Sequence, residues 1–303
     1  MATDVAVVIG NYEGERLLPD CLASIQAQTH VPAEVIVVDA GSLDGSVDVA
    51  ERWGARVIVS TNRGLGSLYN RGAAEATSSY VLFLNNDVAL APACVERLAA
   101  ALDADDRRFA ADPQQVAWGD GAVIHGRTTI TRGRLFGEYL PGLHLDPNVA
   151  ASGIVDTVSA HGAAMLVRRT MHVDVGGFDE TFFLEWEDLD LCWRAWLRGW
   201  SSVYVPGAVV RHRVGAVTTP ALAPRRSASS HHNLVRFALK CLPARAAAIV
   251  VIGELLRLPA HPAAVAGGAA ALVPELPEIL RARRSLGPHD ATFAGMLALS
   301  RPS

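Results

Sequence analysis

The sequence has few of the residues that mark disulfide-bonded or zinc-containing proteins. Its four cysteines form no C-x-x-C pair and lie far apart, at Cys21, Cys94, Cys192 and Cys241. This spacing excludes a thioredoxin-type motif and a zinc ribbon, and it predicts reduced thiols in a cytoplasmic protein. The N-terminus carries Asp4 and no basic segment, so we expect no secretory signal peptide.

Lysine is nearly absent, and the basic residues are unevenly distributed. Lys240 is the only lysine. The formal net charge is −4, but residues 1–220 hold 17 basic and 27 acidic residues, whereas residues 221–303 hold 10 basic and 4 acidic ones. The acidic body excludes a general nucleic-acid-binding protein. The basic tail predicts contact with an anionic surface.

The tail also lacks a long uninterrupted hydrophobic run. Residues 246–280 are apolar but contain Glu254, Arg257, Pro259, His261 and Pro262. Because no stretch of ~18–20 apolar residues remains, we expect no membrane-spanning helix. The arginines at 281, 283 and 284 favour helices that lie in the membrane interface. Packing of the tail against the body or a partner subunit is the alternative.

The glycine patterns of two common nucleotide-binding folds are missing. A dinucleotide fold needs G-x-G-x-x-G directly after its first strand, but this chain has "GNYEGERL" there. No G-x-x-x-x-G-K-[ST] loop is present either. A nicotinamide-dependent oxidoreductase is therefore disfavoured. If the chain binds a nucleotide diphosphate, a divalent cation held by a carboxylate is the usual substitute for a glycine loop.

What the sequence does contain is an alternation of strands and helices. Apolar β-branched runs near 5–12, 34–40, 55–60 and 80–87 are separated by segments with helical spacing. This pattern predicts βαβ units, and hence an α/β fold with a mostly parallel sheet covered by helices on both faces. Ligands of such sheets bind at the carboxyl ends of the strands, which places Asn11, Asp39 and Asp87 on one rim. Residues 106–153 show no strong period and are expected to form loops and short elements.

Six segments, taken in order, resemble a known family. They are "VVIGNYEGERLLPDCLASIQAQT", "VIVVDAGSLDGS", "NRGLGSLYNRGAA", "YVLFLNNDV", "GAAMLVRR" and "GGFDETFFLEWEDLDLCWRAWLRGW". The sequence resembles the family 2 glycosyltransferases of GT-A fold, in their rhamnosyltransferase-like bacterial branch, over about residues 4–240. The resemblance implies a Rossmann-like GT-A domain at 1–220 and a helical extension at 221–303. It also implies transfer of a sugar from a nucleotide diphosphate with inversion, using Mg²⁺ or Mn²⁺.

The resemblance assigns roles to residues on the predicted rim. Asn11, Tyr12 and Glu13 would line the base and ribose. Asp39 would accept a hydrogen bond from the nucleotide, although capping of the turn in "DAGSLDGS" is the alternative. The remaining nucleotide-pocket residues implied are Gly64, Gly66, Asn70 and Asn86, and the start of a helix would also explain the two glycines and Asn70.

The expected metal ligands are Asp87 and His212. "NND" stands where many relatives carry Asp-x-Asp, so Asp87 keeps the last carboxylate while Asn85 replaces the first. A neutral amide binds a hard cation more weakly than a carboxylate does. His212, at the end of a late strand, matches a position where relatives supply a histidine, although a lone histidine is more often structural.

The expected catalytic base is Asp188. Inverting transfer needs one base to take the proton of the attacking hydroxyl, and the resemblance places that base at Asp188, with Trp186 and Glu187 shaping the acceptor site. Acidic residues in a first helical turn are also favoured by the helix dipole alone.

These observations predict a glycosyltransferase at the cytoplasmic membrane face, with the tail on the membrane surface. Its donor would be dTDP-rhamnose or a UDP-hexose, and its acceptor a lipid-linked or other glycan in cell-envelope synthesis. A nucleotide-sugar-binding module without turnover and a natural-product glycosyltransferase are the alternatives.

Overall fold

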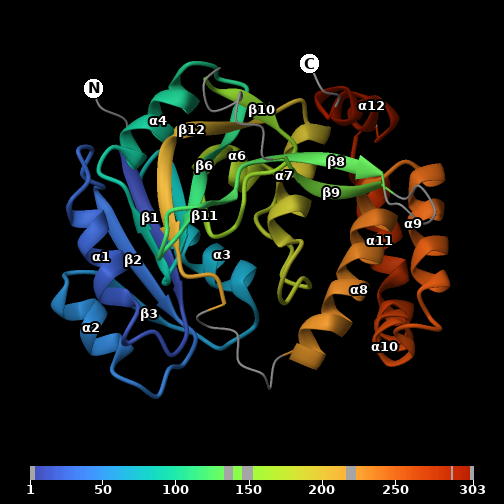
Figure 1. The fold of residues 1–303 in the computed structure, drawn as a ribbon, viewed down its shortest axis with the longest axis horizontal. Coiled ribbons are helices and arrows are strands. Elements are labelled where there is room, and N and C mark those ends of the chain that lie inside the picture. The colour runs from blue at the N-terminus through green and yellow to red at the C-terminus, as the bar shows by residue number, and fades with distance from the viewer. Residues whose placement is uncertain (1–3, 133–138, 145–152, 216–222, 288, 301–303) are drawn as a thin grey trace.

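The structure of the chain is a computed structural model that describes residues 4–132, 139–144, 153–215, 223–287 and 289–300. A ten-stranded mixed sheet forms the body, and a group of helices from the C-terminal part of the chain packs beside it (Figure 1). The strand order is β10-β12-β6-β11-β4-β1-β2-β3, with β5 paired to β12 and β7 paired to β6. The expected α/β fold with a mostly parallel sheet is confirmed, and β11 is antiparallel to both of its neighbours, β6 and β4.

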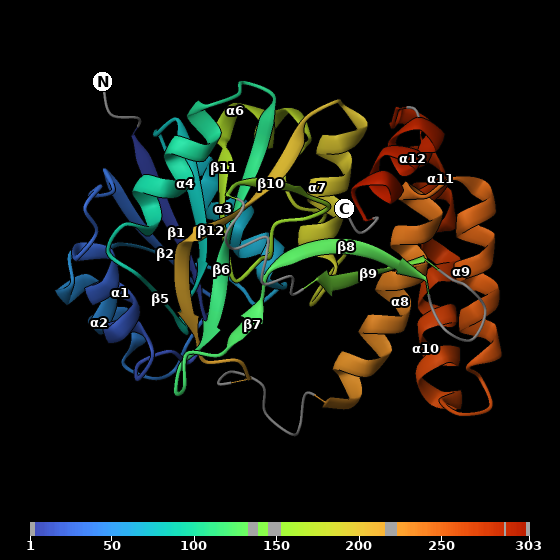
Figure 2. The ribbon, with the colours of Figure 1, turned by 45° about the horizontal axis from the view of Figure 1, so that its top comes forward.

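The strands of the large sheet are β1 (Val5–Asn11), β2 (Glu34–Asp39), β3 (Arg56–Val59), β4 (Tyr80–Asn85), β5 (Val88–Leu90), β6 (Arg108–Ala117), β7 (Val123–His125), β10 (Val155–Thr157), β11 (Ala164–Arg168) and β12 (Ser201–His212). Strands β8 (Arg127–Arg132) and β9 (Tyr139–His144) form a separate ribbon that extends from the body toward the C-terminal helices (Figure 2).

The body helices are α1 (Leu18–Gln26), α2 (Ser46–Arg52), α3 (Leu65–Glu75), α4 (Cys94–Asp103), α6 (Arg169–Asp174) and α7 (Glu187–Leu197). The tail contains α8 (Ala223–Cys241), α9 (Ala244–Leu256), α10 (Pro262–Leu272), η2 (Val273–Glu275), α11 (Leu276–Ser285) and α12 (His289–Leu299).

Alternating side chains of the strands build two cores, one on each face of the sheet. Val5, Val7 and Ile9 of β1 pack in one cluster with apolar residues of α1, α2 and α4. Ala6 and Val8 point the other way and pack with residues of α3 and α7. This is the two-residue period of a strand buried on both faces.

One expectation about the body is wrong. Residues 106–153 were expected to form loops and short elements, but β6 is a ten-residue strand inside the sheet, parallel to β12 and antiparallel to β11. The sequence of β6 does not alternate between apolar and polar residues as a strand usually does, because Asp112 and Gln115 are polar but buried, with exposed fractions of 0% and 1%.

The tail contains helices, as expected, but one of them is longer and more apolar than the interrupted sequence pattern predicted. The continuous helical stretch Pro262–Ser285 has the length and composition of a membrane-crossing helix, and 22% of its most apolar window is buried in the protein. The tail also packs on the body, which was the alternative to membrane contact. A third apolar cluster, which includes Trp193 of α7 and Phe237 of α8, joins the two.

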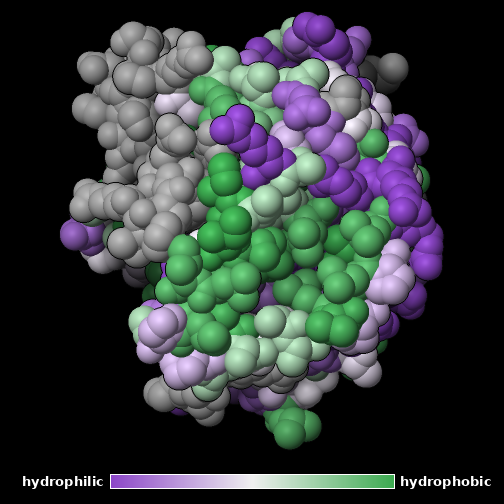
Figure 3. Space-filling model, turned by 90° about the vertical axis from the view of Figure 1, so that its right-hand side faces the viewer, coloured by the Kyte–Doolittle hydropathy of each residue, from purple (hydrophilic) through white to green (hydrophobic). Residues whose placement is uncertain are grey.

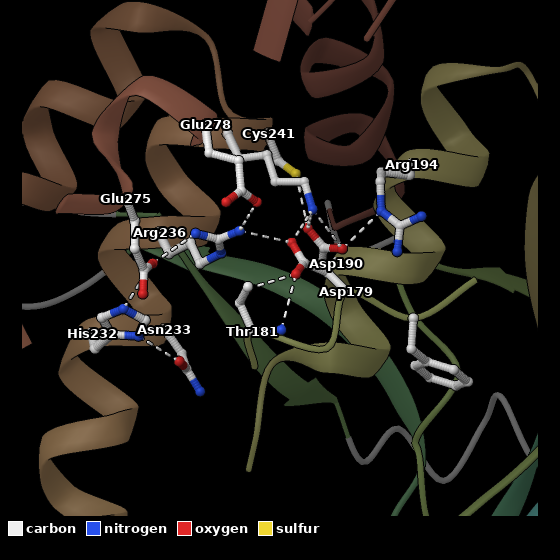
Figure 4. Close-up of polar contacts among 12 residues, drawn as sticks. Asp179, Thr181, Asp190, Arg194, His232, Asn233, Arg236, Cys241, Glu275 and Glu278 are labelled. Atoms are coloured by element: carbon white, nitrogen blue, oxygen red, sulfur yellow. Dashed lines mark hydrogen bonds and ion pairs between the residues drawn. The ribbon is translucent and has the colours of Figure 1, made fainter. Parts of the chain in front are cut away.

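A buried cluster of charges joins α8 to the body (Figure 4). Lys240 Nζ lies 2.8 Å from Asp190 Oδ1 and 2.7 Å from Asp179 Oδ2. On the same helix as Asp190, Arg194 Nε lies 2.7 Å from Asp190 Oδ2. Burial alone would raise the pKa of Asp190, but Lys240 and Arg194 hold it below its usual range. The cluster therefore contributes stability above the ordinary aspartate pKa, and this stability is lost as the pH falls.

We predict that Lys240→Met destabilises the protein by about 3–5 kcal/mol, because it leaves buried carboxylates without one of their cations. Urea unfolding followed by circular dichroism measures the change. The matched control is Arg245→Met at an exposed position of α9, where we expect less than about 0.5 kcal/mol. Equal stability of the Lys240 variant and the wild type would contradict the proposed role of the cluster.

Candidate active site

The carboxyl ends of β1, β2 and β4 bring three polar side chains into one hydrogen-bonded row. The parallel register sets Asn11 beside Asp39 and Gly10 beside Asn85. Asn11 Nδ2 donates to Asp39 Oδ2 at 2.7 Å, and Asn86 Nδ2 donates to Asn11 Oδ1 at 2.7 Å. Asn11, Asp39 and Asn86 therefore meet at this edge of the sheet. The strand pattern predicted Asn11, Asp39 and Asp87 there, and Asp87 directly follows Asn86 in the chain.

Asp39 has hydrogen-bond partners on both carboxylate oxygens. Oδ1 accepts from the backbone N–H groups of Gly41 (3.0 Å) and Ser42 (2.8 Å). Oδ2 accepts from the Ser42 hydroxyl (2.7 Å) as well as from Asn11. These contacts close the turn after β2, which is the alternative role for this residue. Its contact with a nucleotide stays a prediction.

Tyr12 and Glu13 follow β1 at the mouth of the rim. The Tyr12 side chain is exposed by 42%, and its contact with a base stays a prediction. Glu13 has a left-handed backbone (φ +50°), and its Oε1 accepts from Leu43 N–H at 2.8 Å. Glu13 thus connects the loops that follow β1 and β2, and its contact with a nucleotide also stays a prediction.

Gly64, Gly66 and Asn70 contact the segment that leads into α7. A Cβ atom on Gly64 (φ +102°) would lie 2.5 Å from the carbonyl oxygen of Phe183, and one on Gly66 would touch Phe178. Asn70 Oδ1 accepts from Phe178 N–H at 2.8 Å, while its Nδ2 donates to Phe178 O at 2.9 Å. These residues position the 177–183 segment, and their nucleotide-binding role stays a prediction.

Asp87 and His212 face each other in a way that suits a cation. Antiparallel pairing of β5 with β12 places His212 beside Val88, next to Asp87. His212 Nε2 lies 3.4 Å from Asp87 Oδ1, and that oxygen is buried with no hydrogen-bond partner. Gln115 Oε1 lies 2.9 Å from His212 Nδ1, which suits the tautomer with a proton on Nδ1. In that tautomer the lone pair of Nε2 faces the Asp87 carboxylate, as in metal sites where a histidine donates its other N–H to an outer partner.

A cation between Asp87 and His212 would have two protein side chains as ligands rather than three. Among the residues that the structure describes, no group of three His, Cys, Asp or Glu side chains is arranged to hold a metal. Asn85, in the position of the missing carboxylate, accepts from the Tyr69 hydroxyl through Oδ1 at 2.8 Å. Because the amide oxygen of Asn85 already accepts this hydrogen bond, phosphate oxygens and water would supply the remaining ligands of a cation. His212 also lines an open pocket of about 480 Å³ with Trp118 and Arg213.

The start of α7 is held in an unusual backbone conformation. Glu185 and Trp186 are consecutive non-glycine residues with left-handed φ angles of +68° and +76°. Asn233 of α8 donates to the carbonyl oxygens of Leu184 (2.8 Å) and Glu185 (2.9 Å). Such strain persists where the surrounding structure fixes it, and it is common at functional sites. The Trp186 ring packs 5.7 Å from that of Phe237, so α8 shapes the side where the acceptor is expected.

Asp188 is the half-buried carboxylate of this turn. Its Oδ2 accepts from Gly162 N–H at 2.8 Å, and its Oδ1 accepts from Leu189 N–H at 2.7 Å. Asp190 is fully buried in ion pairs with Arg194 and Lys240. Of these two acids, Asp188 is the one whose carboxylate is oriented by neutral donors alone and remains available to a substrate.

Glu187 differs from its neighbour in charge state. It is buried, and its Oε2 has no hydrogen-bond partner. Burial, followed by the charge of Asp188, raises the pKa of Glu187 to about 8. At neutral pH Glu187 is therefore mainly protonated, and it carries a proton that it can donate in a hydrogen bond.

Several residues of the site were given no role by the sequence. Gln115 orients His212 from β6, Gly162 donates to Asp188, and Asn233 reaches the site from α8. Each lies far along the chain from the residue it serves. An unusually polar strand, with Asp112 and Gln115 inside it, was the one available hint.

Comparison with known proteins places the chain in a family. Residues 6–168 match the model of "Glycosyl transferase family 2". The chain is also 30% identical, over 261 residues, to the N-acetylglucosaminyl-diphospho-decaprenol L-rhamnosyltransferase of Mycobacterium tuberculosis, covering 76% of this chain and 82% of that protein. The chain belongs to glycosyltransferase family 2. The resemblance found in the sequence is thereby confirmed.

Solved structures confirm the GT-A fold of this glycosyltransferase. GalNAc-T7 with UDP, GalNAc and Mn²⁺ matches 80% of this chain and 48% of its own at a TM-score of 0.64 and 17% identity. The mannosyltransferase PcManGT of Pyrobaculum calidifontis, with GDP-Man and Mn²⁺, matches 99% of this chain and 81% of its own at a TM-score of 0.57 and 22% identity. Identities this low support the fold alone.

The raised pKa of Glu187 gives a prediction for stability. A carboxyl group whose pKa is higher in the folded than in the unfolded state stabilises below its ordinary pKa and loses that contribution as the pH rises. We therefore expect the stability of Glu187→Gln, relative to wild type, to rise between pH 4.5 and about 8, by at most about 1.4 kcal/mol per pH unit. Thermal or urea unfolding across this range measures it, with the exposed Glu51→Gln as control. A pH-independent difference would contradict the raised pKa.

Proposed function

We propose that this glycosyltransferase is metal-dependent and inverting, and that it transfers a sugar from a nucleotide diphosphate donor to a hydroxyl of a lipid-linked glycan. The observation that carries the proposal is the arrangement of carboxylates. Asp188 is accessible and oriented at the start of α7, while Asp87 faces His212 on the strand rim. One group suits proton abstraction and the other suits a cation.

The proposed reaction uses Asp188 as the base. As the acceptor hydroxyl oxygen attacks the anomeric carbon, Asp188 takes its proton, and the bond from that carbon to the diphosphate breaks with inversion. Gly162 N–H holds one carboxylate oxygen of Asp188, and protonated Glu187 can donate a hydrogen bond nearby. A divalent cation, Mg²⁺ or Mn²⁺, bound by Asp87 and His212 would neutralise the charge of the diphosphate.

The donor and acceptor are proposed from the relatives. Rhamnose from dTDP-rhamnose is the first candidate, because a relative named as an L-rhamnosyltransferase covers most of this chain. UDP-hexoses are the second, since UDP occurs in one structure of similar fold. The same relative's name contains a diphospho-decaprenol acceptor, which supports a lipid-linked acceptor and a role in cell-envelope synthesis. We therefore propose that the enzyme acts as a peripheral protein at the inner face of the cytoplasmic membrane.

We predict that Asp188→Asn lowers transfer by at least about a hundredfold, the scale of general base catalysis, while donor binding is unchanged. Formation of glycosylated acceptor from dTDP-rhamnose or a UDP-hexose measures transfer. Titration of the protein with the nucleotide measures donor binding. The control is Asp174→Asn, an exposed position on α6. Loss of donor binding in Asp188→Asn would contradict the role of the residue as the base.

We also predict that Asp87→Ala removes the Mn²⁺-dependent part of nucleotide binding. A ligand that binds only the folded state raises the unfolding temperature by mass action. The unfolding temperature of the wild-type protein is measured in the presence of UDP, dTDP, GDP or NAD, each with and without Mn²⁺. We expect dTDP or UDP to raise this temperature only when Mn²⁺ is present. Asp48→Ala on the surface of α2 is the control. An unchanged metal response in Asp87→Ala would place the cation elsewhere, and a shift with NAD alone would contradict the proposed function.

A further inference from the structure

The C-terminal helices carry an exposed apolar face. It is formed by the end of α9, the turn after it, η2 and α11, and each of its large side chains is exposed by 37% to 65%. These residues, here called the tail face, are Ile252, Leu255, Leu256, Leu258, Val273, Leu276 and Leu280. Hydrophobic side chains gather over the lower half of this side of the molecule, with hydrophilic ones along its upper right border (Figure 3). Exposed apolar regions of this kind mark contact surfaces.

The acidic and basic residues around the tail face differ in their exposure and in their ion pairs. Three of the four acidic residues of the tail are engaged within the protein. Glu254 pairs with His231 and Arg257, while Glu275 and Glu278 pair with Arg236 of α8. In contrast, Arg245, Arg281 and Arg284 are exposed. Arg236 is shared by Asp179, Glu275 and Glu278, and the Glu278 side chain is 59% exposed. The exposed arginines outnumber this carboxylate, so the surface around the tail face is positive on balance.

We infer that the tail face docks onto the surface of a bilayer that contains anionic phospholipid. The aliphatic side chains would enter the boundary between headgroups and acyl chains, and the exposed arginines would meet lipid phosphates. The combination of apolar area with cations favours anionic lipid over a second copy of the chain, whose tail face would bring the same positive charges together.

The helix Pro262–Ser285 lies on the membrane in this arrangement and does not cross it. Although its length and composition would allow crossing, Glu275 and Glu278 within it are joined to the buried Arg236 of α8. Crossing would break these pairs and carry the two glutamates toward the hydrocarbon, where charge is costly. The packing of α10 and α11 on α8 therefore favours an interfacial position.

Docking through this face suits the acceptor of the proposed function. In Figure 1 the turn between α9 and α10 lies at the lower edge of the molecule, as do the carboxyl ends of β1 and β2. Docking through the tail face, which looks to the right-hand side of Figure 1 (Figure 3), would hold the body next to a lipid-linked acceptor. This step rests on the proposed function, whereas the lipid contact itself does not.

The experiment measures binding of the full-length protein to vesicles without donor or acceptor. We expect co-sedimentation with vesicles of phosphatidylcholine and phosphatidylglycerol, weaker binding to phosphatidylcholine alone, and weakening by added salt. The double variant Leu255→Glu, Leu256→Glu should bind at least about tenfold more weakly, because two aliphatic side chains no longer enter the apolar layer. Arg281→Glu with Arg284→Glu should remove the preference for anionic lipid.

The matched control is Val31→Glu with Val173→Glu, two exposed aliphatic residues of the body, which should bind as wild type does. Circular dichroism and the unfolding temperature verify that each variant is folded. Undiminished binding of the leucine variant, or no vesicle binding by wild type, would overturn the inference. Light scattering that shows a dimer lost in the leucine variant would assign the face to a second copy instead. Because transfer to a water-soluble acceptor is assayed separately, failure of the lipid contact and failure of the proposed function are distinguishable.

Discussion

The buried ion pairs around Asp190 are the interaction on which the rest of the structure depends. Asp190 is fully buried, and its carboxylate is matched by Arg194 and Lys240. Arg194 also donates to the carbonyl oxygens of Val175 and Gly177, at 2.6 and 2.7 Å. One carboxylate thus connects α7, the turn before it and α8. Because a buried charge without a partner is costly, these three elements are held together, and Asp188 is held with them.

The number of hydrogen-bond partners distinguishes Asp39 from Asp87, the two aspartates that follow strands at the edge of the sheet. Asp39 accepts four hydrogen bonds from its own turn and from Asn11. Asp87 Oδ1 is buried and has none. An unsatisfied buried carboxylate oxygen is expensive unless a ligand completes it. This contrast favours Asp87 over Asp39 as the residue that needs a partner from outside the chain, although both follow buried strands of similar sequence.

The sequence allowed the parallel strands β1 to β4 to be predicted but not β6. Strands β1 to β4 are short, mainly apolar runs that alternate with helices, so a parallel sheet with a common edge follows from the local pattern. Strand β6 carries buried Asp112 and Gln115, whose burial depends on partners such as His125 and His212. The clamp of Asn233 on the start of α7 spans 48 residues or more. No local period encodes such pairs, because they depend on the tertiary arrangement.

The use of Asn85 explains how the two halves of the proposed site are spaced. The Tyr69 hydroxyl oxygen lies 2.8 Å from Asn85 Oδ1 and 2.9 Å from Gly162 O, and its one hydrogen is shared between these two acceptors. Gly162 N–H in turn donates to Asp188. Asn85 therefore connects the proposed cation site at Asp87, through Tyr69 and Gly162, to the proposed base Asp188. A cation that finds two protein ligands there is held more weakly than one with three. Its affinity would rise when donor phosphates complete the site, and by linkage the donor would bind more tightly with the cation present. Under the proposed function, cation and nucleotide therefore enter the site as one cooperative unit.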